Sequence, residues 1–73
     1  MPAPTPETSP TPPGRAELDA LARLAEGHTV DRIARDLDVS ERTVRRRLRA
    51  AADHLGADST IQAVVTAVRR GLI

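Results

Sequence analysis

The placement of proline and glycine limits most strongly how this chain can fold. All six prolines lie within the first thirteen residues, whereas the four glycines are spread over the remainder, at positions 14, 27, 56 and 71. Proline interrupts helices, and glycine takes the left-handed backbone conformation in which many helices end. The sequence therefore predicts a disordered Pro/Thr-rich tail or linker over residues 1–13, followed by one proline-free helical domain over residues 14–73.

Four stretches between these breaks have the apolar spacing of amphipathic helices. We predict helices at about residues 15–26, 30–37, 40–55 and 60–70, so the expected fold class is all-α. Thr29, Ser40 and Ser59 precede the last three helices and suit the N-cap position, because a hydroxyl accepts a free backbone N–H there; Gln62 would complete a capping box with Ser59. On the fourth helix we expect the core face to consist of Ile61, Val64, Val65, Val68 and Leu72.

Composition removes several classes of function. The 73 residues include no cysteine and no aromatic residue, and His28 and His54 have no second metal ligand at a useful spacing, so we expect neither a metal site nor a cofactor. No nucleophile, carboxylate pair or glycine-rich phosphate loop is visible, so no enzymatic activity is expected. Base stacking on aromatic side chains is unavailable, which argues against most RNA-binding modules. Without a signal peptide or a run of about 20 apolar residues, we expect a cytoplasmic protein that does not enter membranes.

The third predicted helix carries an arginine-rich face. Five arginines lie between positions 40 and 55 against two acids, so the positive charge is local although the net charge is only +1. At about 100° per residue, one side of this helix is apolar. The opposite side holds Arg42, Arg45, Arg46 and Arg49. Such a face is either a solvated surface or a surface that binds anions.

The connection before this helix favours the second interpretation. Only about three residues separate it from the preceding helix, and Asp38 and Val39 are the first two of them. Two helices joined so tightly form a helix-turn-helix arrangement, in which the second helix enters the major groove of DNA. We therefore predict that Arg45, Arg46 and Arg49 reach base edges or nearby phosphates and that Arg42 and Arg47 contact the DNA backbone. Arginine suits guanine because its planar fork donates two hydrogen bonds.

Several motifs at fixed spacing point to one family. They are Ala-Glu-Gly at 25–27, Ser-Glu-Arg-Thr-Val-Arg at 40–45 and Arg-Gly-Leu-Ile at 70–73. Over about residues 15–73 the chain resembles the LuxR/GerE-type helix-turn-helix domain. The resemblance implies the four-helix, C-terminal output domain of a bacterial transcription regulator. In this family the third helix contacts the major groove and the fourth commonly mediates dimerisation, which implies double-stranded DNA as a partner and a homodimer on it.

The resemblance also assigns roles to individual residues. Thr43 would contact phosphate and Arg45 would contact DNA, while this chain is more basic than the family at positions 46 and 47 and departs from it at Arg23 and Asp31. The full set of expected DNA-binding residues is Thr29, Ser40, Glu41, Arg42, Thr43, Arg45, Arg46, Arg47 and Arg49. The expected dimerisation residues are Ala63, Ala67 and Arg70, since small side chains one turn apart let a second helix approach closely; an exposed helix-favouring surface is the alternative.

A different class of function stays open at this stage. The same scaffold can serve as an adaptor that binds another regulator or RNA polymerase, and the acid-rich first two helices offer a surface for that role. Six acids lie between positions 16 and 39 against three arginines. The chain is either a natural single-domain regulator, acting on the nucleoid, or a C-terminal fragment of a longer one. Neither the target sequence nor the direction of regulation follows from the sequence.

Overall fold

The computed structural model describes residues 12–73, and these form four α-helices and no strand. The helices are α1 (Arg15–Ala25), α2 (Val30–Leu37), α3 (Glu41–Leu55) and α4 (Thr60–Arg69). The predicted all-α class is confirmed, and each helix boundary lies within one residue of its predicted place. Residues 1–11 of the predicted tail lie outside the described residues. No helix in the described part of the chain is both long and apolar enough to cross a membrane.

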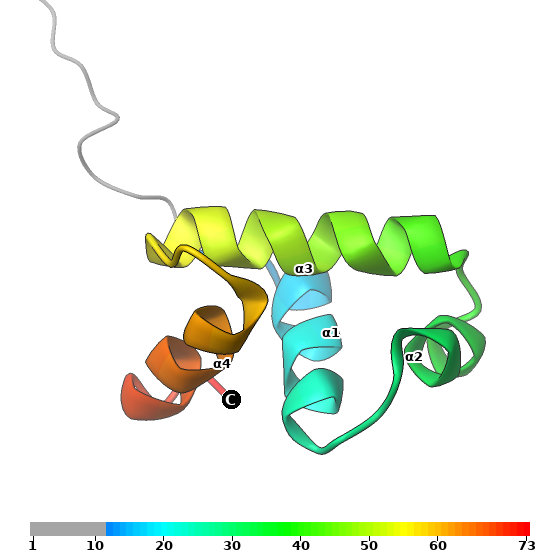
Figure 1. Cartoon of the computed structure of the whole chain (residues 1–73), viewed down its shortest axis with the longest axis horizontal. Helices are drawn as coiled ribbons and strands as arrows, with labels where there is room; N and C mark the ends of the chain where they lie inside the picture. The colour runs from blue at the N-terminus through cyan, green and yellow to red at the C-terminus, as the bar shows by residue number, and fades with distance from the viewer. Residues whose placement is uncertain (1–11) are drawn as a thin grey trace, which may run out of the picture.

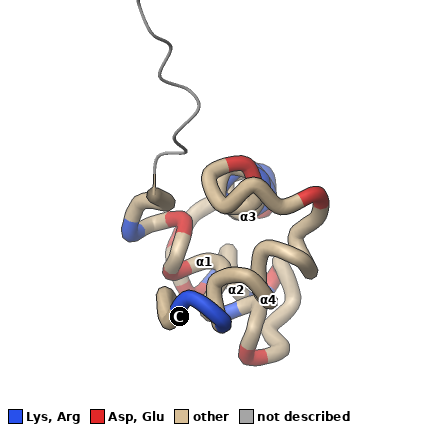
Figure 2. The backbone as a smooth tube through the Cα atoms, turned by 90° about the vertical axis from the view of Figure 1, so that its left-hand side faces the viewer, with Lys and Arg blue, Asp and Glu red and all other residues tan. Residues whose placement is uncertain are grey.

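Helix α3 is the centre of the fold. It packs against each of the other three helices, and α1 also packs against both α2 and α4. All three partners lie on the same side of α3, so its opposite long side is left uncovered (Figure 1). A perpendicular view shows α3 almost end-on, above the other helices (Figure 2). The arrangement therefore presents one complete helix face to solvent.

Three hydroxyl side chains fix where α2, α3 and α4 begin. Thr29, Ser40 and Ser59 each accept a hydrogen bond from the backbone N–H three residues later, at 3.1, 3.0 and 3.1 Å respectively. These bonds satisfy N–H groups that have no partner within the helix. The predicted capping box at α4 is only half formed, because the side chain of Gln62 accepts from the N–H of Asp58 at 2.9 Å instead of that of Ser59.

All four helices end with the same pair of hydrogen bonds. A residue after the helix donates its N–H to the carbonyl three residues back, and the next N–H reaches the carbonyl five residues back. At three ends the first of these residues is a glycine with positive φ, namely Gly27, Gly56 and Gly71. At the end of α2 it is Asp38, with φ 58°. The turn between α2 and α3 is thus closed by an aspartate, which adopts the left-handed conformation at a cost in free energy that glycine does not have.

The core consists largely of small side chains. Six of its eleven members are alanine, which allows the helix axes to approach closely. The core residues are Ala20, Leu21, Ile33, Ala34, Val44, Leu48, Ala51, Ala52, Leu55, Ala63 and Ala67. With so little apolar volume buried, we expect a domain of modest stability.

The predicted core face of α4 is wrong. Ala63 and Ala67 are 0% exposed, whereas Ile61 is 71% and Val68 55% exposed. Of the five residues expected in the core, only Val64 packs against it. The helix turns its alanines inward because it lies against both α3 and α1, and short side chains permit the closest approach there.

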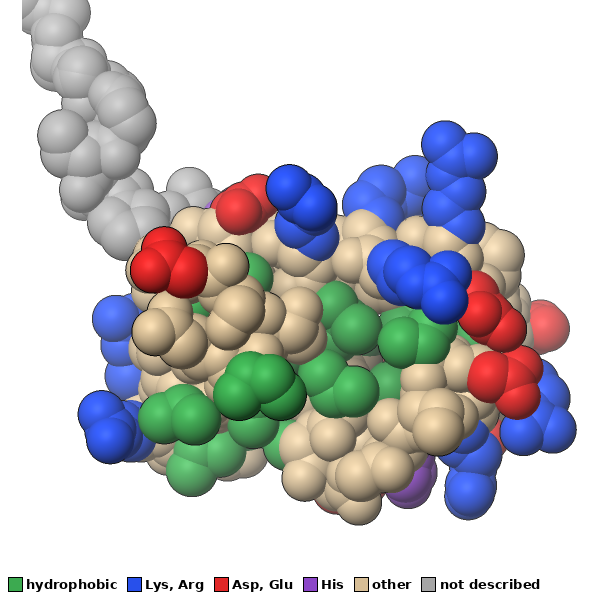
Figure 3. Space-filling view, viewed as in Figure 1, with side chains coloured by type: hydrophobic (Ala, Val, Ile, Leu, Met, Phe, Trp, Pro, Cys, Tyr) green, Lys and Arg blue, Asp and Glu red, His purple; other side chains and the backbone are tan. Residues whose placement is uncertain are grey.

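The large side chains of α4 consequently form a surface patch. Hydrophobic atoms gather over α4 at the lower left of the molecule (Figure 3). We call this surface the α4 patch, and it consists of Ile61, Val65 and Val68 on α4 together with Leu72, which follows the helix.

Candidate nucleic-acid interface

The first turn of α3 is fixed by a pair of hydroxyl side chains. Ser40 accepts from the N–H of Thr43 at 3.0 Å and donates from its own hydroxyl to Oγ1 of Thr43 at 3.1 Å. The turn from α2 contains three residues, 38–40, as the sequence predicted. Thr43 is half-buried. These contacts fix the residue at which α3 begins and so the position of its arginines along the helix.

The uncovered side of α3 carries the predicted arginine face. The side chains of Arg42, Arg45, Arg46 and Arg49 are all exposed. The apolar residues of the opposite side, from Val44 to Leu55, belong to the core. Basic side chains rise from the upper edge of the molecule, along the line of α3 (Figure 3). The separation of a buried side and an arginine side, expected from the helical spacing, is confirmed.

Arg47 lies apart from this face. It is half-buried, and so are Thr43 and His54, which share its flank of the helix at about 100° per residue. His54 in turn lies 3.5 Å from the carboxylate of Glu17 on α1. Arg47 therefore points along the α1 side of α3, away from the most exposed line of arginines.

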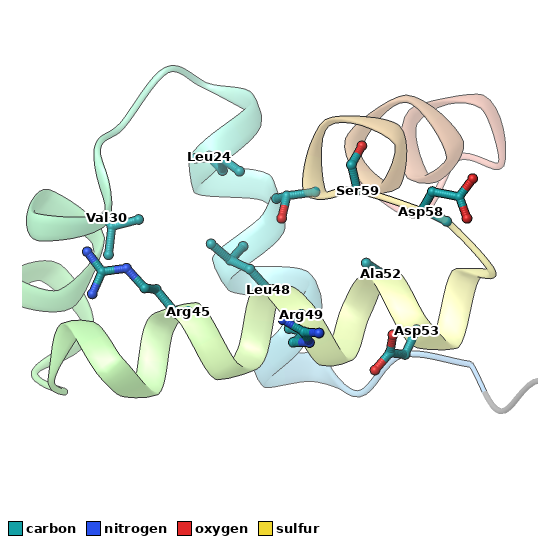
Figure 4. Close-up of a pocket in the computed structure, with 11 residues that line it drawn as sticks. Leu24, Val30, Arg45, Leu48, Arg49, Ala52, Asp53, Asp58 and Ser59 are labelled. Carbon is teal, nitrogen blue, oxygen red and sulfur yellow. The ribbon is translucent and has the colours of Figure 1, made fainter.

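The other flank of α3 borders an open hollow of about 530 Å³. Arg45 and Arg49 lie along one side of it, and the start of α4 forms the opposite side (Figure 4). The floor is apolar and includes Leu24, Val30 and Leu48. Arg45 extends from α3 toward Val30, the first residue of α2 (Figure 4). The arginine face thus continues toward the N-terminus of α2, where Thr29 forms the cap.

Most of the arginines on α3 form no ion pair with the residues that the structure describes. Nη2 of Arg45 donates to Oε1 of Glu41 at 3.3 Å, a contact between successive turns of α3. In the described part of the chain, no carboxylate lies within 4.0 Å of the other four arginines of α3. These guanidinium groups give the uncovered side of α3 a local positive charge.

The acids of α1 and α2 are, in contrast, mostly paired within the molecule. Asp31 lies 3.4 Å from Arg35, and Asp19 lies 3.8 Å from Arg23. Asp36 contacts Arg32 and Arg23 together, at 3.3 and 3.5 Å. Three of the six acids between positions 16 and 39 are therefore paired with arginines of the chain. Sequence spacing indicates the pairs within one helix, but the contact from Asp36 to α1 depends on the fold.

Two of the three predicted dimerisation residues are corrected by the structure. Ala63 and Ala67 are 0% exposed, so neither can contact a second copy of the chain. They serve instead to pack α4 against the rest of the domain, whereas Arg70 is exposed. The exposed apolar side chains of this helix are those of the α4 patch. The spacing of these large apolar residues predicts that they face the core, whereas in the structure they face solvent.

No group of three metal-ligating side chains lies together anywhere in residues 12–73.

Comparison with known proteins places the chain in a family. A family model described as a homeodomain-like domain matches residues 14–61, which contain α1, α2, α3 and the first residues of α4. The chain is also similar to the transcriptional regulatory protein YdfI of Bacillus subtilis (strain 168), with 42% identity over 57 residues. The aligned region covers 78% of this chain but only 27% of that protein, so the chain spans about a quarter of its relative's length. The chain belongs to the homeodomain-like family of helix-turn-helix DNA-binding domains.

Proposed function

We propose that residues 14–73 form the sequence-specific double-stranded DNA-binding domain of a bacterial transcription regulator. The observation that carries the proposal is the row of exposed arginines on the one face of α3 that no other helix covers. The regulatory role is supported by the similarity to YdfI, a protein named as a transcriptional regulator. The LuxR/GerE type is supported by the motifs at 25–27, 40–45 and 70–73, and by a fourth helix that lies mostly beyond the homeodomain-like match.

The shape of the domain suits insertion of α3 into the major groove. A helix with its side chains is about 10–12 Å across and the major groove is about 12 Å wide. Because α1, α2 and α4 lie on the far side of α3, they do not obstruct its approach to DNA. In this pose Arg46 and Arg49 point toward base edges, Arg42 and Arg47 toward the phosphates, and the capped start of α2 at Thr29 toward one strand. Such a protein would act in the cytoplasm, on the nucleoid.

We further propose that two copies associate through the α4 patch when they bind DNA. The patch, made by three exposed apolar side chains of α4 and that of Leu72 just after it, is an unfavourable surface for an isolated monomer, and a symmetric pair would cover it. Stable interfaces use about 20–30 residues from each partner, far more than the patch supplies. We therefore expect a weak dimer that DNA stabilises, with half-sites about one helical turn apart.

The α4 patch also fits the alternative function, an adaptor that binds another regulator or RNA polymerase. Two observations favour DNA over the adaptor. An adaptor does not need the arginine face of α3, and three of the four acids on α1 and α2 are paired with arginines within the chain.

Selection of duplexes from a random pool tests the proposal. The chain should enrich one sequence, and a two-fold repeat of it would indicate a dimer. The Arg46→Gln/Arg49→Gln double variant should lose the enrichment. The matched control, Arg15→Gln/Arg69→Gln, removes the same charge from exposed positions on α1 and α4 and should retain it. If the wild-type chain enriches nothing while it remains helical by circular dichroism, the DNA-binding proposal fails and the adaptor is favoured.

A further inference from the structure

Glu41 is the acidic neighbour of the arginine face. It is the first residue of α3, and its Oε1 lies 3.3 Å from Nη2 of Arg45, with the two side chains 45% and 64% exposed. No other carboxylate in residues 12–73 lies within 4.0 Å of an arginine on α3. A carboxylate in the first turn of a helix is also favoured by the helix dipole. The carboxylate of Glu41 is therefore stabilised at the start of α3 by the helix and by Arg45 together.

The pair has a specific consequence for a polyanion. An arginine that is already paired contributes little net charge, so a phosphate gains less from Arg45 than from an unpaired arginine such as Arg46. The carboxylate of Glu41 also repels any phosphate that approaches the start of α3. Affinity for the DNA backbone, which does not depend on sequence, is thereby reduced at this point.

The same contact orients Arg45. Glu41 accepts from Nη2, and the guanidinium of Arg45 donates no other hydrogen bond to residues 12–73. Arg45 is held extended along its flank of α3, toward Val30 (Figure 4). A guanidinium held in one orientation loses less conformational entropy when it donates two hydrogen bonds to a base. The pair thus weakens binding to phosphate and favours binding to a base in one geometry.

We propose that Glu41 is a positioning residue that raises the sequence specificity of the arginine face, by holding Arg45 and by lowering the affinity of the face for phosphate alone. This inference rests on the proposed function, since it concerns how DNA sequences are distinguished. Glu41 was expected among the DNA-binding residues; here it acts through Arg45 and adds no affinity of its own.

The Glu41→Gln variant tests the inference, because glutamine keeps the size of the side chain and removes its charge. Binding is titrated against the selected duplex and an unrelated duplex, at 50 and 200 mM salt. The variant should bind the unrelated duplex about tenfold more tightly at 50 mM and the selected duplex less than threefold more tightly. The slope of log affinity against log salt concentration should steepen by the equivalent of about one phosphate contact. The variant's gain in affinity for the unrelated duplex should therefore be about threefold smaller at 200 mM than at 50 mM.

Two controls separate the proposed role from others. Asp19→Asn removes a carboxylate from another pair between successive turns, Asp19 with Arg23 on α1, and should change neither affinity nor specificity. In an Arg45→Gln background, Glu41→Gln should no longer alter the ratio of the two affinities, because its partner is absent.

The outcomes distinguish the inference from the function on which it rests. If the wild-type chain prefers the selected duplex and Glu41→Gln leaves that preference unchanged, the role of Glu41 is refuted and DNA binding stands. If Glu41→Gln lowers the affinity for the selected duplex more than that for the unrelated one, Glu41 contacts a base directly, as a carboxylate can with cytosine. That result would also overturn the inference. If the wild-type chain shows no preference among duplexes, both proposals fail.

Discussion

The carboxylate of Asp36 on α2 lies 3.5 Å from the guanidinium of Arg23 on α1 and joins the two helices. The same oxygen lies 3.3 Å from Arg32 and 3.9 Å from a ring nitrogen of His28, in the loop between the helices. Nε of Arg23 and Nδ1 of His28 are buried and have no hydrogen-bond partner among residues 12–73. The carboxylate oxygens near them are Oδ1 of Asp19, 3.8 Å from Nε of Arg23, and Oδ2 of Asp36, 3.9 Å from Nδ1 of His28. One carboxylate thus serves three side chains where α1 meets α2.

Removing this carboxylate should destabilise the domain more than removing an isolated one. We expect Asp36→Asn to lower the free energy of unfolding by about 1 kcal/mol, because a network with partly buried members loses its common counter-charge. Asp31→Asn, which breaks only the exposed pair with Arg35, should cost about 0.3 kcal/mol. Urea denaturation of both variants measures the difference. Equal losses would show that Asp36 is merely another surface ion pair.

Asp38, between α2 and α3, predicts a stabilising substitution. Its φ of 58° costs free energy that glycine avoids, and glycine occupies the corresponding place at the other three helix ends. Asp38→Gly should therefore raise the free energy of unfolding by about 0.5–1 kcal/mol and the melting temperature by a few degrees. Gly56→Ala, at φ 68°, is the reciprocal control and should lower both. A melting temperature that falls in Asp38→Gly would contradict this account of the turn.

Helix positions were predictable from sequence because local chemistry sets them. Glycine ends three helices and a hydroxyl begins three, at Thr29, Ser40 and Ser59, and each effect acts within a few residues. The arginine face followed from helical spacing alone, since the apolar side of α3 is continuous. These features do not depend on how distant segments meet.

The orientation of α4 was not predictable in the same way. Its sequence offers two faces, one of alanine and one of larger apolar residues, and size alone favours the larger face for the core. The choice depends on how closely α4 approaches α3 and α1, which is a property of the packed structure. The ion pair of Asp36 with Arg23 could not be predicted either, because it joins residues on different helices.

Substitutions on the two faces of α4 should have opposite consequences. Ala67→Leu places a large side chain at a position that is 0% exposed and should cost about 1–3 kcal/mol of stability through overpacking. Val65→Ser, on the α4 patch, should change stability by less than about 0.5 kcal/mol and weaken association on DNA. Thermal unfolding and sedimentation of the DNA complexes measure the two effects. Full retention of the dimer on DNA in Val65→Ser, or a wild-type DNA complex that contains a single copy of the chain at every concentration, would refute the α4 patch as the dimer surface.

The two serine caps offer a test of whether the start of α3 matters for DNA as well as for folding. Ser40→Ala and Ser59→Ala each remove one hydroxyl that accepts a backbone N–H, so both should cost about 1 kcal/mol of stability. Only Ser40 also donates to Thr43, and only its helix carries the arginine face. At a temperature where both variants are folded, Ser40→Ala should bind the selected duplex several-fold more weakly and Ser59→Ala should bind it normally. Equal affinities would mean that the first turn of α3 does not position the interface.

Adjacent arginines should differ in what they contribute to DNA binding. Arg46 lies on the exposed face of α3, whereas Arg47 is half-buried on the flank toward α1. Arg46→Ala should therefore lose about 1–3 kcal/mol of discrimination at one base position, the value of a two-bond contact to guanine. Arg47→Ala should weaken all sequences alike and reduce the slope of affinity against salt by about one phosphate contact. Titrations of both variants against the selected duplex and single-base variants of it, at two salt concentrations, separate these effects. A uniform loss in both variants would show that α3 is attached to the phosphates without its arginines distinguishing bases, and would assign sequence preference to the shape of the duplex instead.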